Sequence, residues 1–244
     1  KRTINLYKSQ KFSQAELLGR KLIEMNPKVS FLYNLLGLIL VGQDKYDEAI
    51  IYYKNGIDIQ PDYAMIYNNL GTVYKAKKKF FDAEFYYKKS IKLDNKLSET
   101  QNNLGNLYVQ LNRHKEAIIC FKKSIEINPN FCAAYYNLGI FYKSIGNFKE
   151  SKKSISESIR LLPKFYHAHR AYSQIHKYII DDEHISVMEK LYKAESINAQ
   201  GKVELAYALG KAFDDIKKFK NAYKYYSEGN KLRRANIEFS LKKE

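Results

Sequence analysis

Apolar residues recur along this chain in short stripes that have the spacing of one helix face, and the stripes return every 34 residues. Residues 98–131 show the pattern most clearly. Leu104 and Tyr108 lie four residues apart, as do Ala117 and Phe121 further on. Each pair therefore falls on one side of a helix. The segment predicts two amphipathic helices that pack on each other, with the small Ala117 facing the first helix.

The ends of these helices are also marked. Asn112 and Arg113 lie between the two stripes and indicate a turn. Pro129 is expected to end the second helix, because the residue before a proline, Asn128, is disfavoured in the helical conformation. Each unit is therefore predicted to be two antiparallel helices.

Several columns of residues repeat with this unit. They are Leu36, Leu70, Leu104 and Leu138; Gly37, Gly71, Gly105 and Gly139; and Ala49, Ala83 and Ala117. A glycine inside a helix costs about 1 kcal/mol relative to alanine, so we expect the missing side chain to let the second helix approach closely. A period of 34 residues is typical of stacked helix–turn–helix units. The fold class is predicted to be all-α, an α-solenoid of antiparallel helix pairs.

The predicted organisation follows from the register of these columns. It comprises a partial unit at 1–29, four regular units at 30–63, 64–97, 98–131 and 132–165, a divergent helix pair at 166–202, a final unit at 203–236, and a linker or cut end at 237–244. The divergent pair is expected to have a helix from about Tyr166 to Ile179, an acidic turn at 181–183 and a second helix to about Ser196.

The columns resemble the tetratricopeptide repeat. In unit 64–97 its signature positions are filled by Tyr67, Leu70, Gly71, Tyr74, Ala83 and Tyr87. The resemblance covers nearly the whole chain. It implies a right-handed superhelix that serves as a scaffold for binding proteins or peptides, without indicating which partner is bound.

Charge raises the alternative of a nucleic-acid partner, since the formal net charge is +16 and the pI about 9.5. Only seven of the 42 cationic residues are arginine, and lysine is abundant together with asparagine, isoleucine and tyrosine. This composition favours a solvated basic surface and makes a nucleic-acid partner a poorer interpretation. No apolar run approaches the ~18–20 residues of a membrane span. Two cysteines, Cys120 and Cys132, suit a reducing compartment, and we expect a cytoplasmic location.

No catalytic motif is present in these residues. The sequence lacks the glycine-rich phosphate loops, H-E-x-x-H, C-x-x-C and G-x-S-x-G. His169 and His176 lie seven residues apart on one predicted helix and could share a metal ion, but half-buried packing is the favoured interpretation, as for His167 and His184. We therefore expect no catalytic residue, metal or cofactor.

Asparagine forms the candidate site. The residues are Asn34, Asn68, Asn69, Asn102, Asn103, Asn106 and Asn137, with Leu35 interrupting the column in the first regular unit. Asparagine is a poor helix former, so its recurrence in mid-helix needs a reason. On the concave face, carboxamides could pair with the backbone of an extended peptide. The column resembles the asparagine ladder of O-linked N-acetylglucosamine transferase, and the alternative is a compositional bias.

A carboxylate clamp, the other well-known groove of this family, is not predicted. The corresponding positions hold no cation: Asn34, Leu38, Asn69, Glu99 and Asn103.

A second resemblance concerns the carboxyl-terminal part. Residues 168–178, 181–191 and 204–234 are similar to the region that precedes the catalytic domain in bacterial sulfotransferases with tetratricopeptide repeats. That resemblance implies that a domain binding phosphoadenosine phosphosulfate would follow Glu244. The first hypothesis is therefore a peptide-binding scaffold that recruits the substrate of a larger sulfotransferase. A self-associating structural module and a basic solenoid that binds nucleic acid are the alternatives.

Overall fold

Helices form almost all of the part of the chain that the structure describes. The computed structural model describes residues 2–241, with side chains up to residue 235. Within these residues there are fourteen helices and no strand. The helices divide between two compact units, unit 1 at residues 1–129 and unit 2 at residues 130–244. The predicted all-α class of stacked helix pairs is confirmed.

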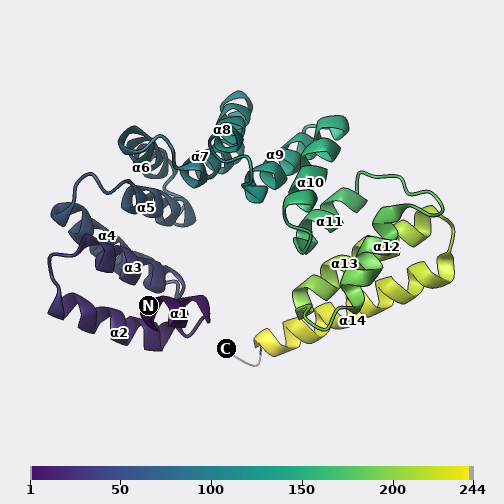
Figure 1. Cartoon of the computed structure of the whole chain (residues 1–244), viewed down its shortest axis with the longest axis horizontal. Helices are drawn as coiled ribbons and strands as arrows, with labels where there is room; N and C mark the ends of the chain where they lie inside the picture. The colour runs from purple at the N-terminus through teal and green to yellow at the C-terminus, as the bar shows by residue number, and fades with distance from the viewer. Residues whose placement is uncertain (1, 242–244) are drawn as a thin grey trace. The chain divides into compact units, whose positions relative to one another are not determined.

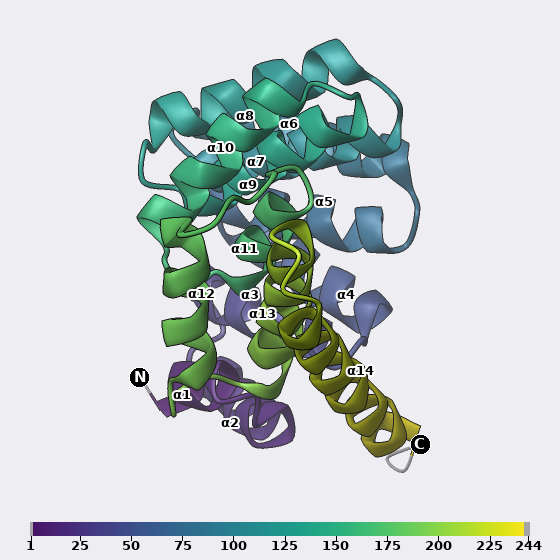
Figure 2. The same cartoon turned by 90° about the vertical axis from the view of Figure 1, so that its right-hand side faces the viewer.

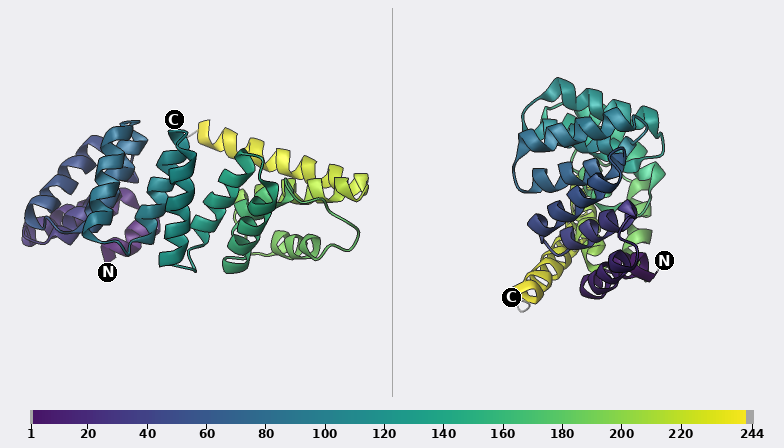
Figure 3. Two further views of the ribbon diagram at one scale, coloured as in Figure 1. Left: turned by 90° about the horizontal axis from the view of Figure 1, so that it is seen from above. Right: turned by 90° about the vertical axis from the view of Figure 1, so that its left-hand side faces the viewer.

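Unit 1 is a regular stack. Its described helices are α1 (Arg2–Lys8), α2 (Phe12–Met25), α3 (Ser30–Val41), α4 (Tyr46–Ile59), α5 (Ala64–Ala76), α6 (Phe80–Leu93), α7 (Ser98–Gln110) and α8 (His114–Ile127). The first helices α3, α5 and α7 each pack on the helix that follows, and they also contact one another. The first helices thus form one layer and the second helices another, as Figures 1 and 3 show.

The turns within the pairs share one backbone feature. Asp44, Lys78 and Asn112 have positive φ angles of 58°, 58° and 56°, and Gly146 of unit 2 has 77°. A residue in the left-handed region reverses the chain sharply after a helix and ends it. The turn predicted at Asn112 is confirmed. The predicted end before Pro129 is confirmed as well, since α8 ends at Ile127 and Asn128 has an extended backbone.

The core of unit 1 explains the glycine column. A Cβ atom added to Gly71 would lie 2.6 Å from the ring of Tyr87, and one added to Gly105 would lie 2.8 Å from the ring of Phe121. Both rings are fully buried. The glycines therefore make room for a large side chain of the second helix, which confirms the predicted close approach. The loss in helix propensity is offset by the burial of a whole aromatic ring.

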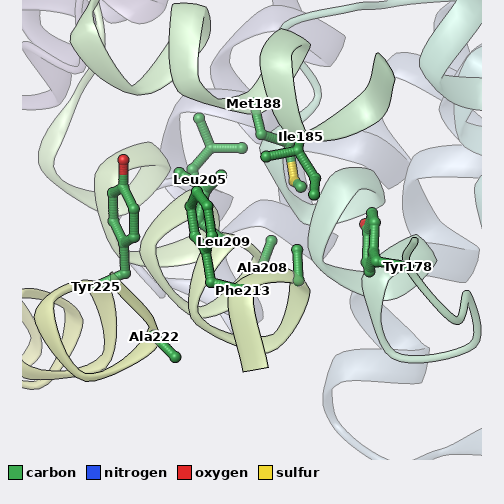
Figure 4. Close-up of a cluster of buried hydrophobic side chains, with 10 residues drawn as sticks. Tyr178, Ile185, Met188, Leu205, Ala208, Leu209, Phe213, Ala222 and Tyr225 are labelled. Atoms are coloured by element: carbon green, nitrogen blue, oxygen red, sulfur yellow. The ribbon is translucent and has the colours of Figure 1, made fainter. Parts of the chain in front are cut away.

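Unit 2 is less regular. Its described helices are α9 (Cys132–Ser144), α10 (Phe148–Leu161), α11 (Tyr166–Ser173), α12 (Glu183–Lys193), α13 (Ala199–Asp215) and α14 (Phe219–Leu241). The pairs α9/α10 and α13/α14 pack directly, and α11 packs on α10 and α13 (Figure 2). A buried cluster lies between α12, α13 and α14 (Figure 4). It includes Ile185, Met188, Leu205, Leu209 and Phe213.

The expected helix from Tyr166 to Ile179 is wrong at its end, because α11 stops at Ser173. The chain then crosses over in residues 174–182 without forming another helix. Contacts with α13 hold it there: the backbone N–H of Tyr178 donates to Asp215 at 3.0 Å, and Lys211 donates to the carbonyl of His176. The bonding partners lie 35 to 37 residues away in sequence. Local periodicity therefore cannot reveal this end.

The last helix pair extends beyond its predicted bounds. α13 begins at Ala199, before the expected start at residue 203, and α14 continues to Leu241. The backbone of residues 237–241 is therefore helical where a linker was expected, while residues 242–244 of that expectation lie outside the described residues. Among the described residues, none of the helices has both the length and the apolar character needed to cross a membrane.

Candidate functional site

The asparagines of unit 1 bond to one another between successive first helices. Nδ2 of Asn69 on α5 donates to Oδ1 of Asn34 on α3 at 2.8 Å, and Nδ2 of Asn103 on α7 donates to Oδ1 of Asn68 at 3.1 Å. Within α5, Asn68 donates to Asn69 at 3.3 Å. Four asparagines thus form a continuous chain of amide hydrogen bonds across three helices.

Most of these amides are buried. The exposed fraction is 4% for Asn34, 1% for Asn68, 9% for Asn69 and 5% for Asn102, whereas Asn103 is half-buried. A buried amide costs free energy unless it is hydrogen-bonded. The mutual bonds meet that requirement, so the structure itself accounts for asparagine in the interior of these helices.

The two neighbouring asparagines of α5 point in different directions. Asn69 bonds to α3 and Asn68 bonds to α7. One residue corresponds to about 100° of rotation around a helix. Thr72 therefore falls about 40° from Asn68, and Met65 about 60° from it, between the two directions. Met65 and Thr72 thus face neither neighbouring first helix.

We call the surface at these positions the open stripe of unit 1. By the 34-residue register, it consists of Phe31 and Leu38 on α3, Met65, Thr72 and Ala76 on α5, and Glu99, Asn106 and Gln110 on α7. All of these side chains are exposed or half-buried. Of the seven predicted asparagines, Asn106 is the one that lies on this stripe.

The chemistry of the open stripe changes along its length. On α3 it is apolar, and Phe31 is 46% exposed. On α5 the hydroxyl of Thr72 is already engaged, by the carbonyl of Asn68 at 3.1 Å and the hydroxyl of Tyr87 at 3.1 Å. On α7, Asn106 forms no hydrogen bond within the part of the chain that the structure describes, and its carboxamide offers two donors and an acceptor. The stripe thus joins an apolar end to an amide end.

Charges near the stripe are sparse and mixed in sign. Glu99 is exposed on α7. Lys75 follows Thr72 by one helical turn, is half-buried and forms no ion pair with the described residues. Burial lowers the pKa of the Lys75 ammonium, because no carboxylate compensates for its lost hydration. One lysine and one acidic side chain on this surface do not make a clamp for a terminal carboxylate.

Unit 2 holds the remaining asparagine and a polar group that the sequence reasoning missed. Asn137 is half-buried on α9. Glu204 on α13 is 5% exposed and accepts hydrogen bonds from Arg170 on α11 at 3.1 Å and from Gln200 at 2.8 Å. The available signal was an acidic residue inside the apolar run from Val203 to Leu209. The carboxylate joins α11 to α13 and holds Arg170 over the ring of Tyr207.

The histidines do not have the arrangement that the sequence suggested. His176 lies beyond the end of α11 and bonds to Asp182 at 2.6 Å, whereas His169 bonds to His184 at 2.8 Å. His167 is exposed, with Nδ1 3.5 Å from Glu204. Among the described residues, no group of three or more histidine, cysteine or acidic side chains could hold a metal ion.

Comparison with protein families identifies the repeats. Models described as tetratricopeptide repeat match residues 64–97, 98–131 and 120–153, and a model described as TPR repeat matches residues 29–78. Two of these matches have the bounds of the predicted units 64–97 and 98–131. No curated protein matches the sequence.

Solved structures support the same fold. The chain is similar to pilF of Pseudomonas aeruginosa, with a TM-score of 0.65 and 18% identity over 89% of this chain and 97% of that one. It is similar to YrrB, described as a TPR protein with an unusual peptide-binding site, with a TM-score of 0.52 and 18% identity over 86% and 97% of the two chains. Identities this low establish the fold alone.

Proposed function

We propose that this chain, which is a tetratricopeptide repeat protein over residues 29–153, docks an extended polypeptide along the open stripe of unit 1. The observation that carries the proposal is the exposed ring of Phe31 on the same stripe as the amides of Asn106 and Gln110. An apolar side chain of the ligand would pack on Phe31 and Leu38, and its backbone would bond to the carboxamides.

This proposal places the peptide contacts on the open stripe and not on the asparagine column of Asn34, Asn68, Asn69 and Asn103. The amides of Asn34, Asn68 and Asn69 are committed to bonds between helices, so they hold the first helices in register. In this proposal these amides do not contact the peptide; they affect its binding only by holding the open stripe in place. The similarity to YrrB, which is described as having a peptide-binding site, supports a peptide as the class of ligand.

Phe31→Ala and Asn106→Ala are each expected to weaken peptide binding about tenfold, corresponding to about 1.4 kcal/mol. The probe is a fluorescent peptide obtained by selecting a random twelve-residue library on the whole chain, and fluorescence anisotropy gives the dissociation constant. Phe31 loses an apolar contact and Asn106 a hydrogen bond.

Two control variants match these changes in residue type. Phe81→Ala removes a ring that is 93% exposed on α6, and Asn55→Ala removes an exposed amide on α4, both outside the first-helix layer. Neither is expected to change the affinity. Equal losses for Phe31→Ala and Phe81→Ala would contradict binding along the open stripe.

The finer proposal is that this scaffold recruits the substrate of a larger sulfotransferase. It is supported by the resemblance of residues 168–178, 181–191 and 204–234 to the region before the catalytic domain of such enzymes. The coding sequence beyond Glu244 tests it directly. A strand followed by a basic loop rich in serine, threonine and glycine is expected, and a stop codon at that point would remove the proposal.

A reducing, cytoplasmic location is supported by the cysteines. Cys120 and Cys132 are both free thiols, and Cys120 is buried on α8. Burial raises the pKa of the Cys120 thiol to about 11, so that it stays protonated at neutral pH. A protonated, buried thiol behaves as a small apolar side chain of the core and not as a nucleophile.

A further inference from the structure

Helix α12 of unit 2 is attached differently from the other second helices. In the regular pairs the second helix packs along the first, but α12 packs mainly on α13 (Figure 2). The crossover segment at residues 174–182 separates it from α11. A side-chain bridge connects the two helices: Nδ1 of His169 on α11 and Nε2 of His184 on α12 lie 2.8 Å apart.

With both rings neutral, the hydrogen bonds around these histidines assign a position to each ring proton. Nε2 of His169 lies 2.8 Å from the carbonyl oxygen of Pro163, which can only accept, so Nε2 carries a hydrogen. In the neutral ring, Nδ1 of His169 then accepts from Nε2–H of His184. Nδ1 of His184 in turn accepts from the hydroxyl of Tyr178 at 2.8 Å. With both histidines neutral, all four ring nitrogens are thus bonded.

The surroundings offer an added proton no carboxylate that is free of other donors. The carboxylate of Asp182 is next to the pair, but it already accepts from His176 at 2.6 Å and from the backbone of His184 at 3.0 Å. Tyr172 of α11 packs against His184, and the charged side chains of other elements lie against the neighbouring rings. These are Lys211 and Asp215 of α13 at Tyr178, and Lys152 of α10 at Tyr172. Two of these are cations, and Asp215 bonds to Lys211 and Lys177.

We propose that the His169–His184 pair is an acid-sensitive contact that holds α12 on unit 2 at neutral pH and releases it in mild acid. A protonated ring must donate from both nitrogens, so the chain of bonds from Tyr178 to Pro163 cannot persist unchanged. Release of α12 would withdraw Ile185 and Met188 from the cluster in Figure 4 and expose the apolar side of α13 around Leu205 and Leu209.

The direction of the pH effect follows from the burial of the pair. Burial lowers the pKa of His169, and it lowers the pKa of His184 to about 3. In the released state both rings would titrate near the ordinary value of about 6.5. The pair therefore stabilises the attached state fully above about pH 6.5, and the population of the attached state decreases as the pH falls below that value. At pH 5 His184 shifts the ratio of attached to released molecules about 30-fold toward release, and His169 shifts it further in the same direction.

Hydrogen exchange of the whole chain at pH 7 and pH 5, corrected for intrinsic rates, tests the proposal. The amides of α12 are expected to lose protection by about 30-fold or more at pH 5, while α5 and α7 of unit 1 keep theirs. Unchanged protection of α12 at pH 5 would overturn the proposal. So would its loss only together with α5 and α7, because that result is global acid unfolding.

Variants separate the pair from other titrating groups. Tyr178→Phe removes the hydrogen bond between the Tyr178 hydroxyl and Nδ1 of His184, which weakens the attached state, so release is expected at a higher pH. Glutamine at position 184 cannot titrate, so in His184→Gln the protection of α12 should depend on pH less steeply between 7 and 5 than in the unaltered chain. His167→Gln is the control: it removes an exposed histidine on α11, the helix of His169, and should behave as the unaltered chain. If His184→Gln does not fold, an unchanged midpoint in Tyr178→Phe still contradicts the proposal.

Discussion

Replacing Phe121 by alanine is expected to lower the free energy of unfolding by about 3–5 kcal/mol. The ring is fully buried and lies against Gly105 on the facing helix. Because Gly105 has no side chain, nothing on α7 can move into the space that the ring leaves. The variant therefore loses the transfer free energy of the ring and keeps a cavity as well. Urea unfolding followed by circular dichroism should show a lower midpoint.

The control of the same residue type is Phe81→Ala, in the preceding unit at a different register position. Its ring is 93% exposed on α6, so its removal should change the free energy of unfolding by no more than about 0.5 kcal/mol. Hydrogen exchange adds a local test, because the stability of stacked repeats depends on nearest neighbours. Phe121→Ala should increase exchange first in α7 and α8. Similar midpoints for the two variants would contradict the packing of large rings against glycines.

The repeat architecture was predictable because it depends on contacts between residues close in sequence, and these contacts recur in each unit. Gly105 and Phe121 meet within one unit, and Gly71 meets Tyr87 in the same way 34 residues earlier, so their columns appear in the sequence itself. The family matches at 64–97 and 98–131 have the bounds that these columns predicted. For these two units, the columns alone are enough to place the repeat.

The end of α11 was not predictable for the opposite reason. Neither glycine nor proline follows Ser173 in the crossover segment, and the apolar spacing continues. The chain leaves the helix because Tyr178 and the carbonyl of His176 bond to α13, whose residues lie more than thirty positions away. The histidines were visible as a cluster, but their pairing depends on this crossover. Contacts that occur once in a fold leave no periodic signal.

The direction of the asparagines needed the structure as well. Adjacent positions such as Asn68 and Asn69 differ by about 100° around the helix, so the direction in which one side chain points does not apply to the next. The sequence pattern showed that amides recur on the first helices. It did not distinguish those that face a neighbouring helix from Asn106, which faces the open stripe. Stability measurements can make that distinction without any ligand.

Asn68→Ala is expected to destabilise the chain by about 1–3 kcal/mol, the cost of leaving buried polar groups without partners. Asn68 is 1% exposed, accepts from Asn103 and donates to Asn69. The variant removes both bonds at once and opens a small cavity between α5 and α7. Asn55→Ala is the matched control, because that amide is exposed on α4 and its loss should be nearly neutral.

A double-mutant cycle with Asn103→Ala then assigns the role of the amide chain. If Asn68 and Asn103 stabilise the unit through their mutual bond, their effects on the free energy of unfolding will not add, and the coupling will be about 0.5–3 kcal/mol. Urea unfolding of the four chains of the cycle supplies this value. A coupling near zero, together with lost peptide binding in Asn103→Ala, would indicate that the asparagine column contacts the ligand directly. A large coupling with unchanged peptide affinity would leave Asn106 and Phe31 as the contacts that select the ligand.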